Sequence, residues 1–336
     1  MISADVSKLQ EIFGDEKTAK QVLNAAKRNA KKRDAPLSAT SPTKKKARTA
    51  PGEILSPADL EDSLALPDVV KDEEELLKTE VFTNRAPLVL AFAFTLLKYT
   101  MPEQPLSSRL SLAQAYVSGS SKDRAISLGI ESGKTAEQEG FGQGQPIIRI
   151  MGRDVRVMRR WGYDPTSNGD EATTQATHST ATVTGDTQKS EVEEKEPPLW
   201  GIDLEALKKS RSQTGPGATT TLPIHTPQSA RAYLIKSFNS PPTEDTPKDT
   251  QTSAKKPPKS GKMAVLAQRE RNLGLLLGAL ELLYESWSAT LSPADLDKRT
   301  WQWYATVRPA VADGVDGWGG KNHVRLEEIL KLRRQL

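Results

Sequence analysis

Three long stretches with almost no large apolar side chains most constrain what this chain can fold into. They span residues 31–54, 164–196 and 239–260 and consist mainly of Ser, Thr, Pro, Lys, Asp and Glu. Such stretches bury too little apolar surface to offset the entropy that is lost when a chain becomes ordered. We therefore expect them to be disordered, and roughly half of the chain to form a packed core.

The segments between these stretches predict a mainly α-helical α+β fold with one β-hairpin. We expect an N-terminal helix over residues 1–30, followed by a disordered basic arm over residues 31–54. A central domain of helices and a hairpin is expected over residues 55–163. A short docking segment, 197–238, and a C-terminal helical unit, 261–336, complete the organisation.

One hexapeptide, Leu-Ser-Pro-Ala-Asp-Leu, occurs twice, at Leu55–Leu60 and at Leu291–Leu296. In each copy the serine suits the N-cap, the proline suits the first helical position, and the aspartate lies in the first turn, where negative charge is favourable. The residues that flank the two copies differ, so we infer no internal repeat. Each copy predicts the start of a helix.

The first part of the central domain predicts three helices. Apolar residues at helical spacing place them at Leu88–Tyr99, Ser107–Val117 and Ser121–Ile130. Gly119 and nearby prolines are expected to break the chain between these helices. The first of the three is almost entirely apolar, which indicates a buried helix.

A β-hairpin is expected next. Alternating residues at Pro146–Met151 and Val155–Arg159 surround a short turn, Gly152-Arg153-Asp154. Three helices and a hairpin are the order of a winged-helix domain, whose third helix enters the major groove while the hairpin contacts phosphates. The alternative is an interaction domain whose hairpin arginines simply face solvent. The residues that a nucleic acid would contact are Lys122, Arg124, Arg149, Arg153, Arg156, Arg159 and Arg160.

Aromatic side chains are concentrated in the C-terminal segment. A long helix there has an apolar stripe that runs from Leu273 to Trp287 and favours a core position for Trp287. Trp301 and Trp303 are two residues apart and cannot share one face of the next helix. One of them is therefore expected to be exposed or to meet another segment, which makes it a candidate docking residue, because tryptophan is enriched at interface hot spots.

Residues 27–48 hold the most specific motif, two basic clusters separated by ten residues. This arrangement suits two acidic grooves of a nuclear import receptor, or a phosphate backbone; the alternative is a solvated arm with no specific reader. We predict a nuclear protein. Ser41, followed by proline, is a candidate phosphorylation site that would add roughly −2 charge beside the second cluster. The residues of the predicted import signal are Lys27, Arg28, Lys31, Lys32, Arg33, Lys44, Lys45, Lys46 and Arg48.

Residue patterns for catalysis or metal binding are lacking. The chain has no cysteine, its three histidines lack partners at metal-ligand spacing, and it has no G-x-S-x-G motif. We therefore expect no enzyme activity, no metal and no other cofactor. The most apolar run, Pro87–Leu97, is too short to span a bilayer, so no membrane association is expected.

Four short stretches resemble an uncharacterised filamentous-fungal protein family: Leu106–Ala115, Gly142–Pro146, Met151–Arg153 and Gly317–Lys321. The label "Impact N-terminal" is associated with that family. An Impact domain would show an Asp-Asp-Gly-Glu stretch and an Arg-Trp-Tyr-Gly-Gly strand end, whereas here only Arg160–Tyr163 has a partial likeness. The resemblance therefore implies no activity and no site residues.

The sequence leaves two functions open. The first is a nuclear scaffold or adaptor that binds an import receptor and other protein partners, with DNA or RNA as a further candidate ligand. The alternative is a winged-helix DNA-binding protein that acts in transcription or chromosome maintenance.

Overall fold

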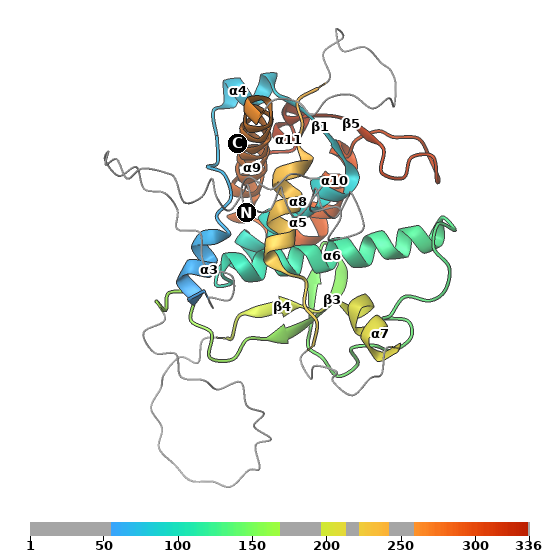
Figure 1. Ribbon diagram of the computed structural model, residues 1–336. Helices are drawn as coiled ribbons and strands as arrows, with labels where there is room; N and C mark the ends of the chain where they lie inside the picture. The colour runs from blue at the N-terminus through green and yellow to red at the C-terminus, as the bar shows by residue number, and fades with distance from the viewer. Residues whose placement is uncertain (1–54, 169–195, 213–221, 242–258, 335–336) are drawn as a thin grey trace, which may run out of the picture. The chain divides into compact units, whose positions relative to one another are not determined.

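The computed structural model describes residues 55–168, 196–212, 222–241 and 259–334 (Figure 1). They belong to a single unit of the chain, Leu55–Leu336. The expected N-terminal helix, the basic arm and most of the two linkers lie outside the described residues.

The described elements follow one another along the chain in the following order. They are α3 (Pro57–Ser63), α4 (Glu73–Lys78), β1 (Glu80–Asn84), α5 (Arg85–Thr100), α6 (Leu106–Ser127), β2 (Ile147–Ile150), β3 (Arg153–Arg159), β4 (Leu199–Gly201), α7 (Leu204–Ser212), α8 (Pro227–Ser237), α9 (Lys259–Ser288), α10 (Pro293–Val307), β5 (Lys321–Arg325) and α11 (Leu326–Leu330).

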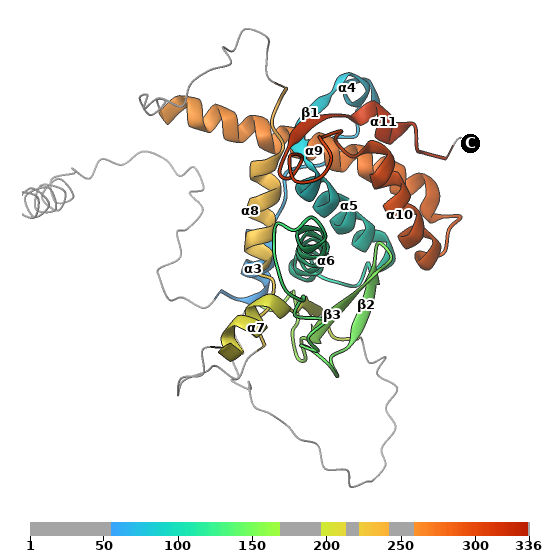
Figure 2. The same ribbon diagram turned by 90° about the vertical axis from the view of Figure 1, so that its right-hand side faces the viewer.

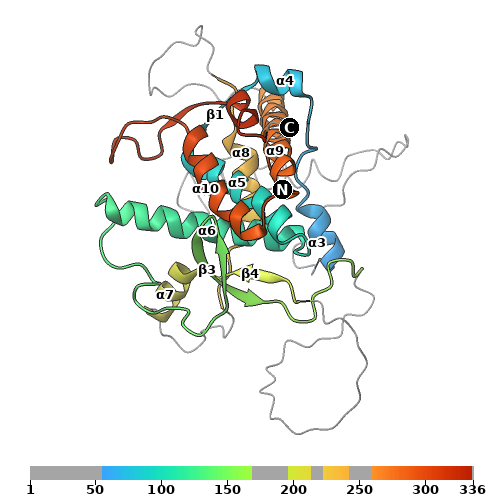
Figure 3. The ribbon, with the colours of Figure 1, turned by 180° about the vertical axis from the view of Figure 1, so that it is seen from behind.

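Helix α6 lies between a three-stranded antiparallel sheet and the helices α5, α8, α9 and α10 (Figures 1 and 3). The sheet has the order β2-β3-β4, and β3 and β4 both contact α6. Gly201 permits the close approach of β4, since a Cβ atom there would lie 2.8 Å from the carbonyl oxygen of Ser111. Helices α5 and α8 also pack on α6, and α9 and α10 in turn contact α5.

A second, two-stranded sheet ties the C-terminal end to the start of the unit. Strand β1 pairs antiparallel with β5, with Glu80 opposite Arg325 and Asn84 opposite Lys321. The pairing continues into α11, where the backbone N–H of Leu326 donates to the carbonyl of Thr79 over 3.1 Å. No strand was expected from the sequence at either position.

The core is shared by segments that the sequence analysis assigned to different units. Every residue of α5 from Pro87 to Leu97 is buried, which confirms the expected buried helix. The predicted stripe of α9 faces the same core, where Leu280 and Tyr284 are 0% exposed. The C-terminal helices are therefore part of one packed body with the central elements, whereas a separate helical unit was expected.

Two expected helices are a single helix. Residues 107–127 form one continuous helix, α6, because Gly119 is helical and does not end it. Its lack of a side chain serves packing instead, since a Cβ atom there would lie 2.9 Å from the Arg153 guanidinium. The three separate helices of the winged-helix interpretation are thus two, and no helix begins at Ser121.

The hairpin is present, with a shorter turn than expected. Strands β2 and β3 pair with Ile150 opposite Arg153, so the turn residues are Met151 and Gly152. Both have positive φ, 48° and 77°. The hairpin is extended by β4, which contains Trp200. The fold is mainly α-helical with little strand, as predicted.

Both copies of the hexapeptide begin a helix. The hydroxyl of Ser56 accepts a hydrogen bond from the N–H of Asp59 over 3.1 Å, and that of Ser292 accepts one from Asp295 over 3.2 Å. Proline follows the cap in both, at the start of α3 and of α10. The shared capping solution is confirmed.

Candidate functional site

A cavity of about 400 Å³ lies among the first turn of α5, the second half of α6, the end of α10 and the loop of residues 309–320. We call it the Trp301 cavity. The loop extends from the body beside the C-terminal half of α6 (Figures 1 and 3). The volume falls in the range of pockets that hold small ligands or side chains of a partner.

Two tryptophans line this cavity and are incompletely covered. Trp301 on α10 is 45% exposed and Trp318 in the loop is 43% exposed. Trp303, on the same helix as Trp301, is only 6% exposed and packs into the core. The expected division of the two α10 tryptophans between the core and an exposed face is therefore confirmed, with Trp301 as the exposed member.

Tyr304 forms the buried wall of the Trp301 cavity. Its ring lies 5.5 Å from the ring of Trp301, and its hydroxyl donates to the carbonyl oxygen of Arg85 over 3.4 Å. Burial raises the pKa of Tyr304 to about 12, against the opposing effect of Arg85 and Arg308. The hydroxyl is therefore neutral at physiological pH and acts as a hydrogen-bonding group.

Three arginines from three elements line the cavity. Arg124 on α6 and Arg308 at the end of α10 are exposed, and neither guanidinium has a carboxylate partner among the described residues. Arg85, at the start of α5, donates from Nε to the carbonyl of Pro309 over 3.3 Å. No lining residue in the described part of the chain is acidic. The cavity therefore has a net positive charge.

The start of α5 adds to this positive character. Its N-cap residue, Asn84, lines the cavity but makes no side-chain hydrogen bond to the first turn. The N-terminal end of a helix carries a partial positive charge. Arg85 and Ala86, in that first turn, also line the cavity.

Glycines shape the loop that borders the cavity. A Cβ atom at Gly317 would lie 1.7 Å from the carbonyl oxygen of Ala312, so only glycine fits where the loop folds back on itself. Gly319 has a φ of 73°, which L side chains rarely adopt. This geometry places Trp318, which lies between the two glycines, at the cavity.

A second hollow, of about 70 Å³, lies between α6 and β3 and is lined by charged groups that neutralise one another. Arg153 forms ion pairs with Asp123 and, over 3.2 Å, with Glu137. Lys122 pairs with Glu131. These cations bind within the fold, and the hollow leaves less space for a ligand than the Trp301 cavity.

His225 also borders this smaller hollow. Burial lowers its pKa, and Asp203, 3.8 Å away, has the opposite effect. In the described residues no group of three His, Asp or Glu side chains is placed to hold a metal ion.

The basic residues expected to contact nucleic acid do not form one surface. Arg160 is only 8% exposed, so its expected surface role is wrong. Its guanidinium lies 3.2 Å from the ring centroid of Tyr163 and 3.7 Å from that of Trp200. Arg156 is half-buried, and its side chain lies close to Gly142.

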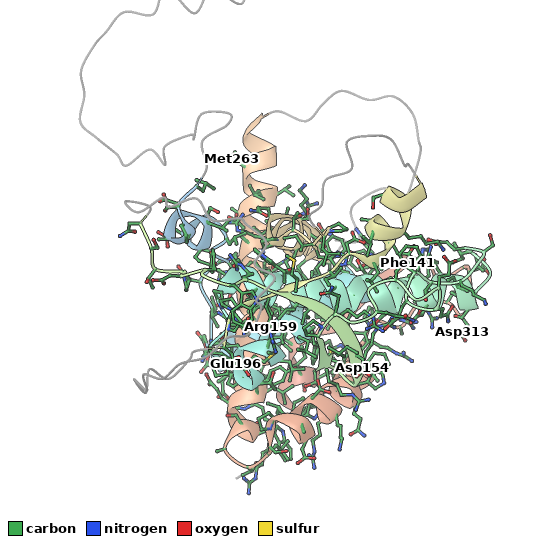
Figure 4. The ribbon with its side chains drawn as sticks, turned by 90° about the horizontal axis from the view of Figure 1, so that it is seen from below. Phe141, Asp154, Arg159, Glu196, Met263 and Asp313 are labelled. Atoms are coloured by element: carbon green, nitrogen blue, oxygen red, sulfur yellow. The ribbon has the colours of Figure 1, made fainter. Side chains whose placement is uncertain are left out.

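Three members of that set, Arg124, Arg149 and Arg159, are exposed at the surface. Arg149 is exposed on β2, 3.6 Å from Asp154, and Arg159 lies over the exposed ring of Trp161. Figure 4 shows Asp154 and Arg159 near the two ends of β3. Only Arg124 of the predicted set belongs to the Trp301 cavity. The predicted import signal and Ser41 lie outside the described residues.

Sequence reasoning missed the two other arginines of the cavity. Arg85 and Arg308 are isolated basic residues, 223 positions apart, and only the packing of α10 on α5 brings both to one cavity. For Trp318, the neighbouring glycines were the available sequence signal of a special loop.

Comparisons with protein-family models, with curated proteins and with solved structures gave no significant match. Within the described ranges, none of the helices is both long and apolar enough for a membrane span.

Proposed function

We propose that this chain is a nuclear adaptor protein that binds a partner protein at the Trp301 cavity. One observation carries the proposal: two tryptophans from different elements, each more than 40% exposed, line one cavity together with arginines that have no described ion-pair partner. Trp and Arg are among the side chains most enriched at interface hot spots.

The contrast within α10 supports a binding role for Trp301. The core of this helix already uses Trp303 and Tyr304, which are 6% and 5% exposed. Trp301 is therefore not needed to fill the core, and leaving a large apolar side chain in water brings no stability. A partner that covers it gains the free energy of burying that surface.

The proposed nuclear location rests on the two basic clusters of residues 27–48. A variant with alanine at Lys44, Lys45 and Lys46 is expected to lose nuclear accumulation, because the second receptor groove is left empty. Fluorescence microscopy of tagged chains checks this. Unchanged accumulation, also when the first cluster is replaced, would contradict the nuclear assignment.

Binding at the cavity is tested by affinity purification from nuclei. The double variant Trp301→Ala/Trp318→Ala is expected to lose at least one partner that the wild type retains. The matched control is Trp161→Ala, which removes a tryptophan that is 70% exposed outside the cavity. Identical partner sets for the double variant and the wild type would overturn the proposal.

A further inference from the structure

We infer that the group bound in the Trp301 cavity is a phosphorylated side chain of a partner peptide, next to an apolar residue. The inference rests on the proposed function, since it names the chemistry of the partner. Its basis is the combination of lining groups, three guanidinium groups, two exposed indoles and serine hydroxyls, with no described carboxylate among them.

Charge favours a dianion over a carboxylate. Arg85, Arg124 and Arg308 line the same cavity, so their positive charges add there. A single carboxylate would neutralise one of these charges, whereas a phosphate group carries about −1.5 to −2 at pH 7 and presents three acceptor oxygens. Arginine forks match phosphate geometry, and clusters of arginine are a recurring means of phosphopeptide recognition.

The polar residues that could complete such a site lie on one face of α6. Ser120 and Ser121 line the cavity one turn before Arg124. Their hydroxyl groups are donors suited to phosphate oxygens that the arginines leave free. The exposed rings of Trp301 and Trp318 offer apolar surface for the neighbouring residue of the peptide.

The surroundings favour a peptide over a polynucleotide. The loop that borders the cavity carries Asp313 and Asp316, both exposed. A nucleic acid carries a negative charge at every phosphate, so a strand that continued from the cavity would meet these carboxylates. A peptide with one phosphorylated residue has no further phosphate groups that would meet these carboxylates.

The test uses the full chain and degenerate peptide pools with a fixed central residue. The pools contain phosphoserine, phosphothreonine, phosphotyrosine, glutamate or unmodified serine, and retention on the immobilised chain is measured. At least one phosphorylated pool is expected to be retained about tenfold more than the unmodified and glutamate pools, the effect of one or two charge-assisted hydrogen bonds. Equal retention of the glutamate or unmodified pool would overturn the inference.

Arginine variants locate the binding. Arg308→Gln and Arg124→Gln are each expected to lower phosphopeptide retention about tenfold, while the control Arg149→Gln, at an exposed arginine outside the cavity, binds as the wild type. Both cavity arginines are exposed, and thermal unfolding checks that the variants fold. Retention that is insensitive to both would overturn the assignment, as would a dT15 oligonucleotide that binds in preference to the peptides and is lost in the same variants.

The inference and the proposed function fail in different ways. If partners from nuclei depend on Trp301 and Trp318 but remain bound after phosphatase treatment, the phosphate assignment fails and the adaptor function stands. If the partners are insensitive to both tryptophans, the proposed function itself fails.

Discussion

The carboxylate of Asp297 on α10 accepts a hydrogen bond from the backbone N–H of Met151 over 2.5 Å, although the two residues are 146 positions apart. Its second oxygen accepts one from the N–H of Gly152 over 2.7 Å. One side chain thus holds both turn residues of the hairpin. Trp301 follows Asp297 by one helical turn, so the contact also positions the helix that presents the cavity's exposed indole.

Removing this carboxylate is expected to destabilise the fold. Asp297→Ala leaves the two turn N–H groups without acceptors, one of them buried, at an expected cost of about 2–3 kcal/mol. Urea unfolding measures the change. Asp313→Ala, at an exposed loop position, is the control and is expected to unfold as the wild type does. Equal stability of all three chains would show that the contact is dispensable.

The same residue predicts a pH dependence. Burial raises the pKa of Asp297 above its ordinary value of 3.8, although the two backbone hydrogen bonds oppose the shift. The folded state therefore binds the proton more tightly than the unfolded state. The resulting stability is fully present below the unfolded pKa and is lost as pH rises through the folded pKa.

The measurement compares the free energy of unfolding of the wild type and of Asp297→Asn over about pH 3.5 to 7. The stability of the wild type relative to the variant is expected to fall with rising pH and then to level off. A relative stability that increases with pH would mean that the folded carboxyl has a lowered pKa.

Replacement of Arg160, even by lysine, is expected to destabilise the fold. Its planar guanidinium lies between the rings of Tyr163 and Trp200 and donates to the hydroxyl of Ser107 over 2.8 Å. Lysine lacks the planar fork, so Arg160→Lys is expected to lose about 1–3 kcal/mol of stability. Arg159→Lys, at the exposed neighbour, is expected to change the urea midpoint little. Equal effects of the two substitutions would contradict the buried role of Arg160.

The change in stability caused by Gly278→Ala shows by its sign whether the chain packs closely against α9 at this glycine. Alanine in place of glycine inside a helix normally stabilises by roughly 1 kcal/mol. In α9, however, a Cβ atom at Gly278 would lie 1.8 Å from the carbonyl oxygen of Val70, and the N–H of Val70 donates to Gly274 over 3.2 Å. Gly278→Ala is therefore expected to destabilise by about 1–3 kcal/mol. If thermal unfolding showed that the variant is more stable than the wild type, the backbone at Val70 would not pack closely against α9.

Local signals predicted the elements that depend on nearby residues. The serine–proline caps, the apolar helix α5 and the hairpin follow from neighbouring side chains, and each is present. The helix break predicted at Gly119 was wrong, because a glycine inside a helix can also permit the close approach of another side chain, here that of Arg153. Whether the glycine ends the helix or permits a close approach depends here on Arg153, which is 34 positions away, and the periodicity of apolar residues does not reveal such a partner.

The candidate site was predictable only in part. Because Trp301 and Trp303 cannot share one face of a helix, the sequence predicted that one of the two is exposed. The arginines of the Trp301 cavity come together through long-range packing. The short strands β1 and β5, which pair residues 80–84 with residues 321–325, carry no strong periodic signal. The structure also shows a feature without an assigned role: the first turns of α9 project from the body, with Met263 71% exposed (Figures 2 and 4).

Site-specific photo-crosslinking in nuclei tests the adaptor function at the Trp301 cavity most directly. A benzophenone amino acid is placed at Val315, which is 56% exposed on the loop that borders the cavity, or at Ile147, which is 51% exposed on β2. Discrete protein crosslinks are expected from position 315, lost on Trp301→Ala/Arg308→Gln, and not from position 147. Crosslinks that are the same from both positions, or that persist in the cavity variant, would contradict binding at this site.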